Sequence, residues 1–318
     1  GITETSVNCP IIASMEVVQL GTLANGLPVY IDKQAYGADG IVVINRIKPH
    51  TAFRGPSESG LVKMITIGLG KQKGADSCHR YGFKHMAENI TAMAKVVLSQ
   101  APVLFGIGTI ESAYEQIAKI VAVPAKEILA ADAKLQREAK ENLPRLPFDQ
   151  IDVLVIDQIG KDISGDGMDP NITGRYPTPY ASGGPSVSKM VVLDLTEGSH
   201  GNANGMGTAD FTTRRLANKV KFAITYANVL TSTVVRASHF PMVLESDRLA
   251  VQAAIKTCNA FDMAKVHLVR IKDTLHLGEI FISEAMLEEA RANPKITVLR
   301  EPFVWEFDEY GNSLTNYL

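Results

Sequence analysis

Cysteine is scarce in this sequence, and its scarcity argues against a protein held together by disulfides. The 318 residues include three cysteines, Cys9, Cys78 and Cys258, which are widely separated. An odd number of scattered cysteines does not form a disulfide framework, and no two are close enough to indicate a zinc knuckle. The pattern is typical of a reducing compartment, and we expect a cytoplasmic protein.

Long hydrophobic runs and an excess of charge are missing as well. The longest apolar runs, residues 153–156 and 190–195, are far shorter than a membrane span. The sequence opens without a basic region followed by an apolar stretch, so we expect no secretion signal. Its formal net charge is -2, without a block of lysine and arginine. We therefore expect neither nucleic acid nor a membrane as a partner.

Short apolar strands alternate with longer helical segments along the chain, which predicts crossover connections and a mainly parallel sheet covered on both faces. The expected fold class is α/β. Strands are expected at residues 27–31, 41–45, 103–107, 151–157, 190–195, 266–271 and 296–299. Helices are expected at residues 83–100, 124–142, 208–218, 247–259 and 283–292.

The chain is long for one domain and comfortable for two. Residues 144–149 form a plausible join, which predicts a first domain at residues 1–148 and a second α/β lobe at residues 149–318. Residues 160–188 break the alternation, because they are crowded with glycine, proline, aspartate, asparagine and serine. A loop of that length inside a compact domain is usually functional or flexible.

Chemically versatile residues are concentrated between residues 45 and 85. The polar part begins where the predicted strand 41–45 ends, and ligands of parallel α/β sheets bind outside the carboxyl ends of strands. Arg46, Lys48 and His50 would emerge there together, with Arg54 close behind. Such a cluster suits a small anionic molecule, because guanidinium and ammonium groups pair with carboxylate or phosphate. The glycines of this segment form neither a Walker loop nor a dinucleotide fingerprint.

Three residues of this segment stand out, although each also has an ordinary interpretation. His50 can be a histidine of a surface loop, Lys63 a solvated lysine, and His79 a hydrogen-bonding loop residue. However, residues 61–67 around Lys63 are largely apolar. Such surroundings remove water from the amine and favour its neutral, nucleophilic form.

Three runs together resemble the nickel-dependent lactate racemase family: Asn-Arg-Ile-Lys-Pro-His at residues 45–50, Gly-Leu-Val-Lys-Met at 60–64 and Gly-Ala-Asp-Ser-Cys-His at 74–79. In that family a histidine acts in proton transfer, and a downstream lysine covalently carries a nickel-pincer nucleotide. A histidine sixteen positions after the lysine ligates the nickel, and Lys63 and His79 are sixteen positions apart. The resemblance extends over residues 10–160.

The resemblance implies a role for each residue of the segment. His50 and Lys63 would be catalytic, and His79 would ligate nickel. Lys63 would also bind the cofactor, together with Arg46, Lys48 and Lys71. The gap between His50 and Lys63 is a few residues longer than in the racemases.

The sequence departs from the family at its beginning. Family members have a further N-terminal segment with a second catalytic histidine, a substrate-binding arginine and contacts to the nucleotide phosphate. Residues 1–49 contain no histidine, and Arg46 is their only arginine. The N-terminal part of the first domain is thus missing by comparison with the family, and we expect either a fragment or a shortened relative that has lost or repurposed the site. In both cases the chain alone should be inactive or very weak as a racemase.

The implied activity is that of a racemase or epimerase of a small 2-hydroxy acid. Inversion requires removal of hydrogen from an unactivated α-carbon, which the family achieves by hydride transfer to the pincer ring while histidines manage the hydroxyl proton. The sequence leaves the substrate and a homo-oligomeric state open.

Two alternatives also stay open. One is a metal-dependent enzyme of another class that uses the region of Asp166, Asp169 and His200, since spaced carboxylates in a loop can hold Mg²⁺ or Ca²⁺. The other is a non-enzymatic binding module for an anionic metabolite or nucleotide. The remaining candidates for the second lobe are Asp162, Asn171, Glu197 and Asp210. We interpret His239, His267 and His276 as structural, because none has a spaced partner.

Overall fold

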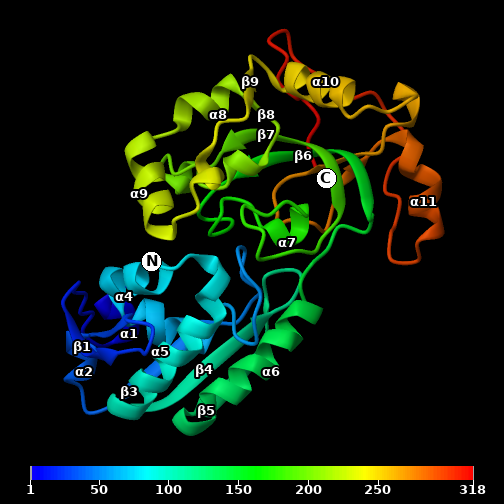
Figure 1. Ribbon diagram of the computed structural model, residues 1–318. Coiled ribbons are helices and arrows are strands. Elements are labelled where there is room, and N and C mark those ends of the chain that lie inside the picture. Colours follow the sequence, from blue (N-terminus) through cyan, green and yellow to red (C-terminus); the bar gives the residue numbers. More distant parts are fainter. Residues whose placement is uncertain (1, 318) are drawn as a thin grey trace. The chain divides into compact units, whose positions relative to one another are not determined.

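The computed structural model describes residues 2–317, and the chain divides into two compact units. The first unit comprises Gly1–Ser112 and Gln116–Asn142, and the second comprises Ala113–Glu115 and Leu143–Leu318. Both units combine helices with strands, which confirms the predicted α/β class (Figure 1). Within residues 2–317, no helix combines the length and the apolar character needed to cross a bilayer.

The first unit carries the candidate site residues between its third and fourth strands. Its elements are α1 (Glu4–Val7), β1 (Val17–Thr22), β2 (Pro28–Asp32), α2 (Lys33–Tyr36), β3 (Ile41–Arg46), α3 (Leu61–Lys63), the π-helix η1 (Met64–Gly68), α4 (Lys71–His79), η2 (Phe83–His85), α5 (Met86–Gln100), β4 (Val103–Glu111), β5 (Ile117–Pro124), η3 (Ala125–Glu127) and α6 (Ile128–Glu141).

Strand β4 lies in the middle of a three-stranded sheet, parallel to β3 and antiparallel to β5, while β1 and β2 form a separate antiparallel pair. Two glycines of β4 let other elements approach this sheet closely. A Cβ atom on Gly106 would lie 2.8 Å from the side chain of Leu61, and one on Gly108 would lie 2.7 Å from Ile47. The start of α3 therefore packs directly on the sheet, and α6 runs beside β4 (Figure 1).

The second unit contains the remaining elements. They are β6 (Gln150–Ile159), α7 (Pro170–Thr173), β7 (Ser186–Leu195), η4 (Glu197–Ser199), η5 (Met206–Thr208), β8 (Phe211–Thr213), α8 (Arg214–Lys219), α9 (Phe222–Ser232), η6 (Val235–Ser238), β9 (Met242–Leu244), α10 (Asp247–Thr257), η7 (Met263–Lys265), β10 (Leu268–Ile271), β11 (Phe281–Ile282), η8 (Glu284–Met286) and α11 (Leu287–Ala292).

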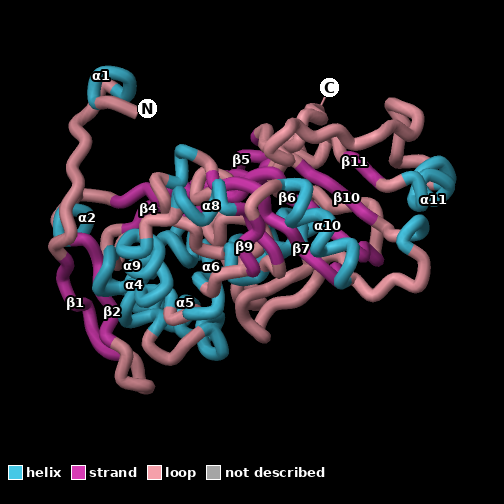
Figure 2. Tube along the Cα trace, turned by 90° about the horizontal axis from the view of Figure 1, so that it is seen from above, coloured by secondary structure: helices cyan, strands magenta, loops and turns pink. Residues whose placement is uncertain are grey.

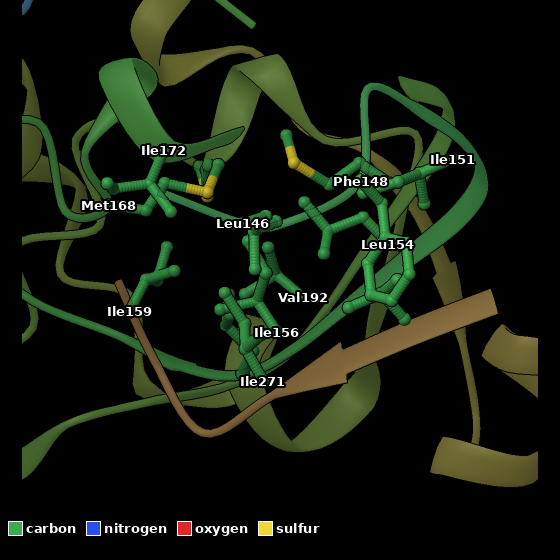
Figure 3. Close-up of a cluster of buried hydrophobic side chains, with 14 of the residues drawn as sticks. Leu146, Phe148, Ile151, Leu154, Ile156, Ile159, Met168, Ile172, Val192 and Ile271 are labelled. Atoms are coloured by element: carbon green, nitrogen blue, oxygen red, sulfur yellow. The ribbon is translucent and has the colours of Figure 1, made fainter. Parts of the chain in front are cut away.

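Its sheet has the strand order β11-β10-β6-β7-β8-β9, of which Figure 2 labels all strands but β8. Every neighbouring pair is parallel except β10 and β11. Strand β6 is buried on both faces. Val153 and Val155 belong to one core cluster, while Leu154 and Ile156 belong to the other, which Figure 3 shows. A strand covered on both sides has apolar residues at every position, which is why β6 reads as a continuous hydrophobic run.

Two predicted elements are wrong. The helix expected at residues 208–218 is divided, because Phe211–Thr213 forms β8, which pairs with both β7 and β9 before α8 begins. The strand expected at residues 296–299 does not form, although this stretch is apolar and partly β-branched. Ile296 instead packs against a hydrophobic cluster of the second unit. A strand requires a neighbour to pair with, and local composition does not supply one.

Candidate functional site

His50 lies on the loop that follows β3, and a buried carboxylate fixes the backbone of this loop. Glu58, with no exposed surface, accepts hydrogen bonds from the backbone N–H of His50 at 2.9 Å and of Gly55 at 3.0 Å. The backbone N–H of Lys48 donates to the carbonyl of Ser59 at 2.8 Å. These bonds close the loop on itself, so the position of His50 is tied to that of Glu58.

Side chains on one face of α6 form hydrogen bonds with the end of this loop, around Glu58 and Leu61. Asp132 accepts from the backbone N–H of Leu61 at 2.7 Å, and Lys140 donates to Glu58 at 2.6 Å. Between them, Gln136 accepts from the backbone N–H groups of Glu58 and Ser59, each at 3.3 Å. Residues four positions apart share a helix face. The sequence reasoning missed this row, although polar side chains at that spacing beside the buried Leu135 and Ala139 were a usable signal.

Lys63 is the last residue of α3, and the π-helix η1 begins at the next residue. Short π-helical turns occur frequently at functional sites. The half-buried side chain of Lys63 reaches His50, with 3.0 Å between its Nζ and Nε2 of the imidazole. Leu61 and Val62, just before it, are fully buried and anchor the helix.

The imidazole of His50 is neutral at pH 7. Burial holds its pKa well below the ordinary value of 6.5, and the charges of Lys63, His79, Lys48 and Arg54 lower the pKa further. These four neighbours are basic side chains, so protonation of His50 would place a further positive charge beside them.

His79, the last residue of α4, has its ring fixed in one tautomer. Its Nδ1 lies 2.7 Å from the carbonyl oxygen of Ala75, one turn earlier in the helix. Because a carbonyl only accepts, Nδ1 carries the proton and Nε2 carries the lone pair. Burial is the main cause that lowers the pKa of His79, and Lys63 adds to the effect. A neutral imidazole oriented in this way is the form that binds a transition metal.

Two phenylalanines join the histidines into one cluster. The ring of Phe83 lies 5.8 Å from that of His50 and 5.3 Å from that of His79, measured between centroids. Phe53 lies 4.5 Å from His50. The structure therefore brings His50, Lys63 and His79 together within the first unit, at an apolar wall that the sequence reasoning did not identify.

Of the cations expected to bind the cofactor, only Lys48 and Lys63 lie near His50, whereas Arg46 and Lys71 pair with carboxylates elsewhere in the first unit. Lys48 is close enough for its charge to act on His50. In contrast, Arg46 forms an ion pair with Glu111 at 2.7 Å, and Lys71 forms one with Asp32 at 3.2 Å.

The candidate carboxylates of the second unit each have their own hydrogen-bond or ion-pair partner. Asp169 caps α7 by accepting from the N–H of Asn171 at 2.9 Å, and Asp166 accepts from Asn204 at 2.9 Å. In the described part of the chain, no three histidine, cysteine, aspartate or glutamate side chains are grouped so that they could hold a metal ion. The region of Asp166, Asp169 and His200 therefore gives the metal-dependent alternative no ready-made site.

The other carboxylates named for the second lobe have partners as well. Asp162 accepts from the hydroxyl of Thr196, Asp210 pairs with Arg175 and Glu197 pairs with Lys219.

His276, which we interpreted as lacking a spaced partner, has one. Its Nδ1 lies 2.7 Å from Oδ2 of Asp273, three residues earlier, and Asp273 is buried. The Asp-x-x-His spacing in the sequence was the overlooked signal.

Comparison with known proteins identifies similar folds but no family. No protein-family model matches the chain, and no curated protein matches it. One similar solved structure is the lactate racemase apoprotein from Thermoanaerobacterium thermosaccharolyticum, with 14% identity and a TM-score of 0.44 over 81% of this chain and 67% of that one.

A second similar structure is a protein from Thermotoga maritima, with 12% identity and a TM-score of 0.38 over 56% of this chain and 47% of that one. The chain thus spans less than half of the Thermotoga protein. These values describe a distant likeness of fold alone.

Proposed function

We propose that this chain belongs to a racemase or epimerase of small 2-hydroxy acids whose cofactor is a nickel-pincer nucleotide attached to Lys63. The observation that carries the proposal is the 3.0 Å contact between Nζ of Lys63 and Nε2 of His50, beside the neutral imidazole of His79. An amine and two imidazoles, the groups that the proposal needs for attachment, proton transfer and metal ligation, thus lie in one cluster. The identity of the cofactor comes from the resemblance of residues 45–79 to the racemase family.

The donor set of the cluster fits such a group. Lys63 supplies an amine for the covalent attachment, and Nε2 of His79 supplies a borderline-soft ligand suited to nickel. Among residues 2–317 no three histidine, cysteine, aspartate or glutamate side chains are grouped as a metal site, so His79 would need further nickel ligands from the cofactor. When bound, the cofactor would accept the α-hydrogen of the substrate as hydride and return it.

The residues of this chain would bind, orient and protonate the substrate. His50 exchanges a proton with the substrate hydroxyl, and its neutral state at pH 7 suits it to that role. Lys48 and Arg54 supply positive charge for a carboxylate or phosphate. Phe53 and Phe83 exclude water from one side of the imidazoles, which strengthens these electrostatic interactions.

Intact-mass analysis tests the proposal. The chain is co-expressed with cofactor-synthesis enzymes and weighed, and racemisation of several 2-hydroxy acids is assayed in parallel. We expect an adduct on the wild-type chain and none on Lys63→Ala. The matched control, Lys73→Ala, removes an exposed lysine of α4 and should keep the adduct. An adduct that persists in Lys63→Ala, or a wild-type chain that never acquires one, would contradict the proposal.

A second candidate function is a binding module for an anionic metabolite or nucleotide. It is favoured by the basic side chains of Lys48, Arg54 and Lys63 near His50. Calorimetric titration of the unmodified protein with lactate and with adenosine monophosphate, together with the mass analysis, distinguishes the two. Binding without an adduct or turnover supports the module, and turnover that depends on the adduct rejects it.

A further inference from the structure

The three-stranded sheet of the first unit has one face that the helices cover. On this face, a Cβ atom on Gly106 of β4 would touch Leu61 of α3. The register places Gly106 beside Val43 of β3 and Val123 of β5, and both of these valines are buried. Since successive residues of a strand point to opposite faces, their neighbours in the sequence lie on the other side of the sheet.

The other face of this sheet is apolar and exposed. Ile107 of β4 lies between Ile44 of β3 and Ala122 of β5 in the register. Four large aliphatic side chains on this face are between 42% and 64% exposed: Val42, Ile44, Ile117 and Ile120. Strands that carry apolar side chains on both faces are normally buried on both. We call this surface the bare face, and its composition predicts a cover.

Residues 2–15 form an arm, and Figure 2 shows its helix α1 clear of the other elements of the first unit. The hydrogen bonds described for the arm are local: Thr3 caps α1 through Ser6, and Oε1 of Glu4 accepts from the N–H of Ile11 at 2.9 Å. Five large apolar side chains of the arm are between 43% and 79% exposed: Ile2, Val7, Ile11, Ile12 and Met15. The arm and the bare face are thus two exposed apolar surfaces of one chain, and burial of one against the other is favourable.

The arm leaves the first unit on the side away from the bare face. It continues into β1, which packs against α5, and α5 packs against α3. Because α3 lies on the covered face of the sheet, these helices separate the root of the arm from the bare face of its own chain. A second copy presents the same face without this obstacle. A mutual exchange of arms also closes on itself as a two-fold dimer.

The area of these surfaces is sufficient for a stable dimer. A standard interface buries about 800 Å² per partner, of which about 57% is apolar, so each copy must supply about 450 Å² of apolar surface. Burial of one half-exposed aliphatic side chain removes on the order of 60 Å² from water. In a mutual exchange each copy contributes the five side chains of its arm and the four of its bare face, which together supply roughly 500 Å².

We propose that two copies of this chain exchange their arms, so that residues 2–15 of each copy cover the bare face of the partner's β3-β4-β5 sheet. The ion pair between Arg46 and Glu111 lies on the same face, beyond its aliphatic side chains, and forms a polar rim of the contact. The inference involves neither Lys63 nor nickel, so it stands or falls independently of the proposed function.

The oligomeric state of the whole chain, measured by sedimentation equilibrium over a concentration series, tests the proposal. We expect a dimer. Ile12→Asp in the arm and Ile44→Asp on the bare face should each raise the dissociation constant at least about thirtyfold, the effect of losing one hot-spot side chain. Both side chains are exposed in a single copy, so neither change should disturb the fold of the monomer, which circular dichroism verifies.

Leu230→Asp is the matched control. Leu230 is an exposed aliphatic residue of α9, in the second unit, and its replacement should leave the dissociation constant unchanged. Equal weakening by all three substitutions would indicate unspecific association of apolar surfaces and overturn the proposal. So would a dimer that neither Ile12→Asp nor Ile44→Asp weakens. A monomer at every concentration also overturns it, and assigns the bare face to a different partner.

Cys9, an exposed thiol on the arm, reports which surface the arm covers. Cys78 and Cys258 are buried, so Ala122→Cys adds one accessible thiol, on the bare face. Isotopically labelled and unlabelled chains of this variant are mixed, oxidised and digested. We expect a disulfide that joins Cys9 of one isotopic form to position 122 of the other. Lys95→Cys, on the exposed side of α5, is the control and should form no such bond.

The isotopic composition of the cross-link distinguishes exchange between copies from closure within one copy. A disulfide confined to fragments of the same isotopic form means that the arm covers the sheet of its own chain, which overturns the exchange. Cross-linking at position 95 as efficient as that at position 122 means that the arm contacts surfaces at random, and this result overturns the proposal as well.

Discussion

Oε1 of Glu58 lies 2.6 Å from Nζ of Lys140, across 82 positions of sequence. The same carboxylate accepts from the backbone of His50 and Gly55, so it joins α6 to the loop that carries the catalytic candidate. A fully buried carboxylate is retained only when it is paired and hydrogen-bonded, and Glu58 meets both conditions. Helix α6 therefore helps to hold the loop that carries His50.

Replacement of Glu58 by glutamine should destabilise the first unit by about 1–3 kcal/mol, because donors that lose a buried acceptor cost that much. Hydrogen exchange of residues 50–63 measured against urea reports on this unit, whereas the only tryptophan, Trp305, lies in the second. The matched control is Glu138→Gln, which removes a surface partner of Lys119 and should cost less than about 1 kcal/mol. If the two substitutions lowered the free energy of unfolding equally, Glu58 would stabilise the first unit no more than a surface carboxylate does.

The strands and long helices were predictable because their residues obey periodic rules. β6 is apolar at successive positions because both of its faces are buried, and α5 repeats its buried residues at helical spacing. The antiparallel strand β5 was missed because a helix was expected to begin at its last residue, Pro124. Strand β8 has only three residues, too few to show a period, and it exists through its pairing with β7 and β9.

The site was predictable only as a set of residue types in one segment. The sequence located His50, Lys63 and His79, whose side chains lie in one cluster. It did not predict that Arg46 pairs with Glu111, because that contact depends on β4 lying beside β3. Nor did it predict the contact between Glu58 and α6, since such long-range contacts arise from packing and leave no local pattern.

Nickel retention should depend on His79 more than on any other histidine of the first unit. His79→Ala removes the imidazole with the correctly placed lone pair, and loss of one ligand should lower the nickel content of co-expressed protein at least about tenfold. The adduct on Lys63 should remain, since the covalent bond does not involve His79. The control is His85→Ala, an exposed histidine of the neighbouring turn, which should keep full nickel content. The measurement is metal analysis of desalted protein, and equal loss in both variants would contradict the assignment.

The stability of the first unit should fall with acidity, in part because of His50. In the unfolded chain its pKa is the ordinary 6.5, whereas burial holds the folded pKa well below that value. Below pH 6.5 the unfolded chain therefore binds a proton that the folded protein refuses. The contribution of His50 is fully present above pH 6.5 and is lost as the pH falls towards the folded pKa, by at most about 1.4 kcal/mol per pH unit.

His50→Gln removes this titration, so its free energy of unfolding should decline less between pH 7.5 and pH 5 than that of the wild-type chain. His79 titrates in both proteins, so the difference between them reports on His50 and on its interaction with His79. The measurement is hydrogen exchange of α5 in a urea series at the two pH values, because α5 lies within the first unit and its amides are outside the substituted loop. His85→Gln, which alters an exposed ring, should leave the decline unchanged. Equal loss of stability in His50→Gln and the wild-type chain over this interval would mean that His50 binds its proton as readily in the folded protein as in the unfolded chain. That result would refute the lowered pKa of His50 and its neutral state at the site.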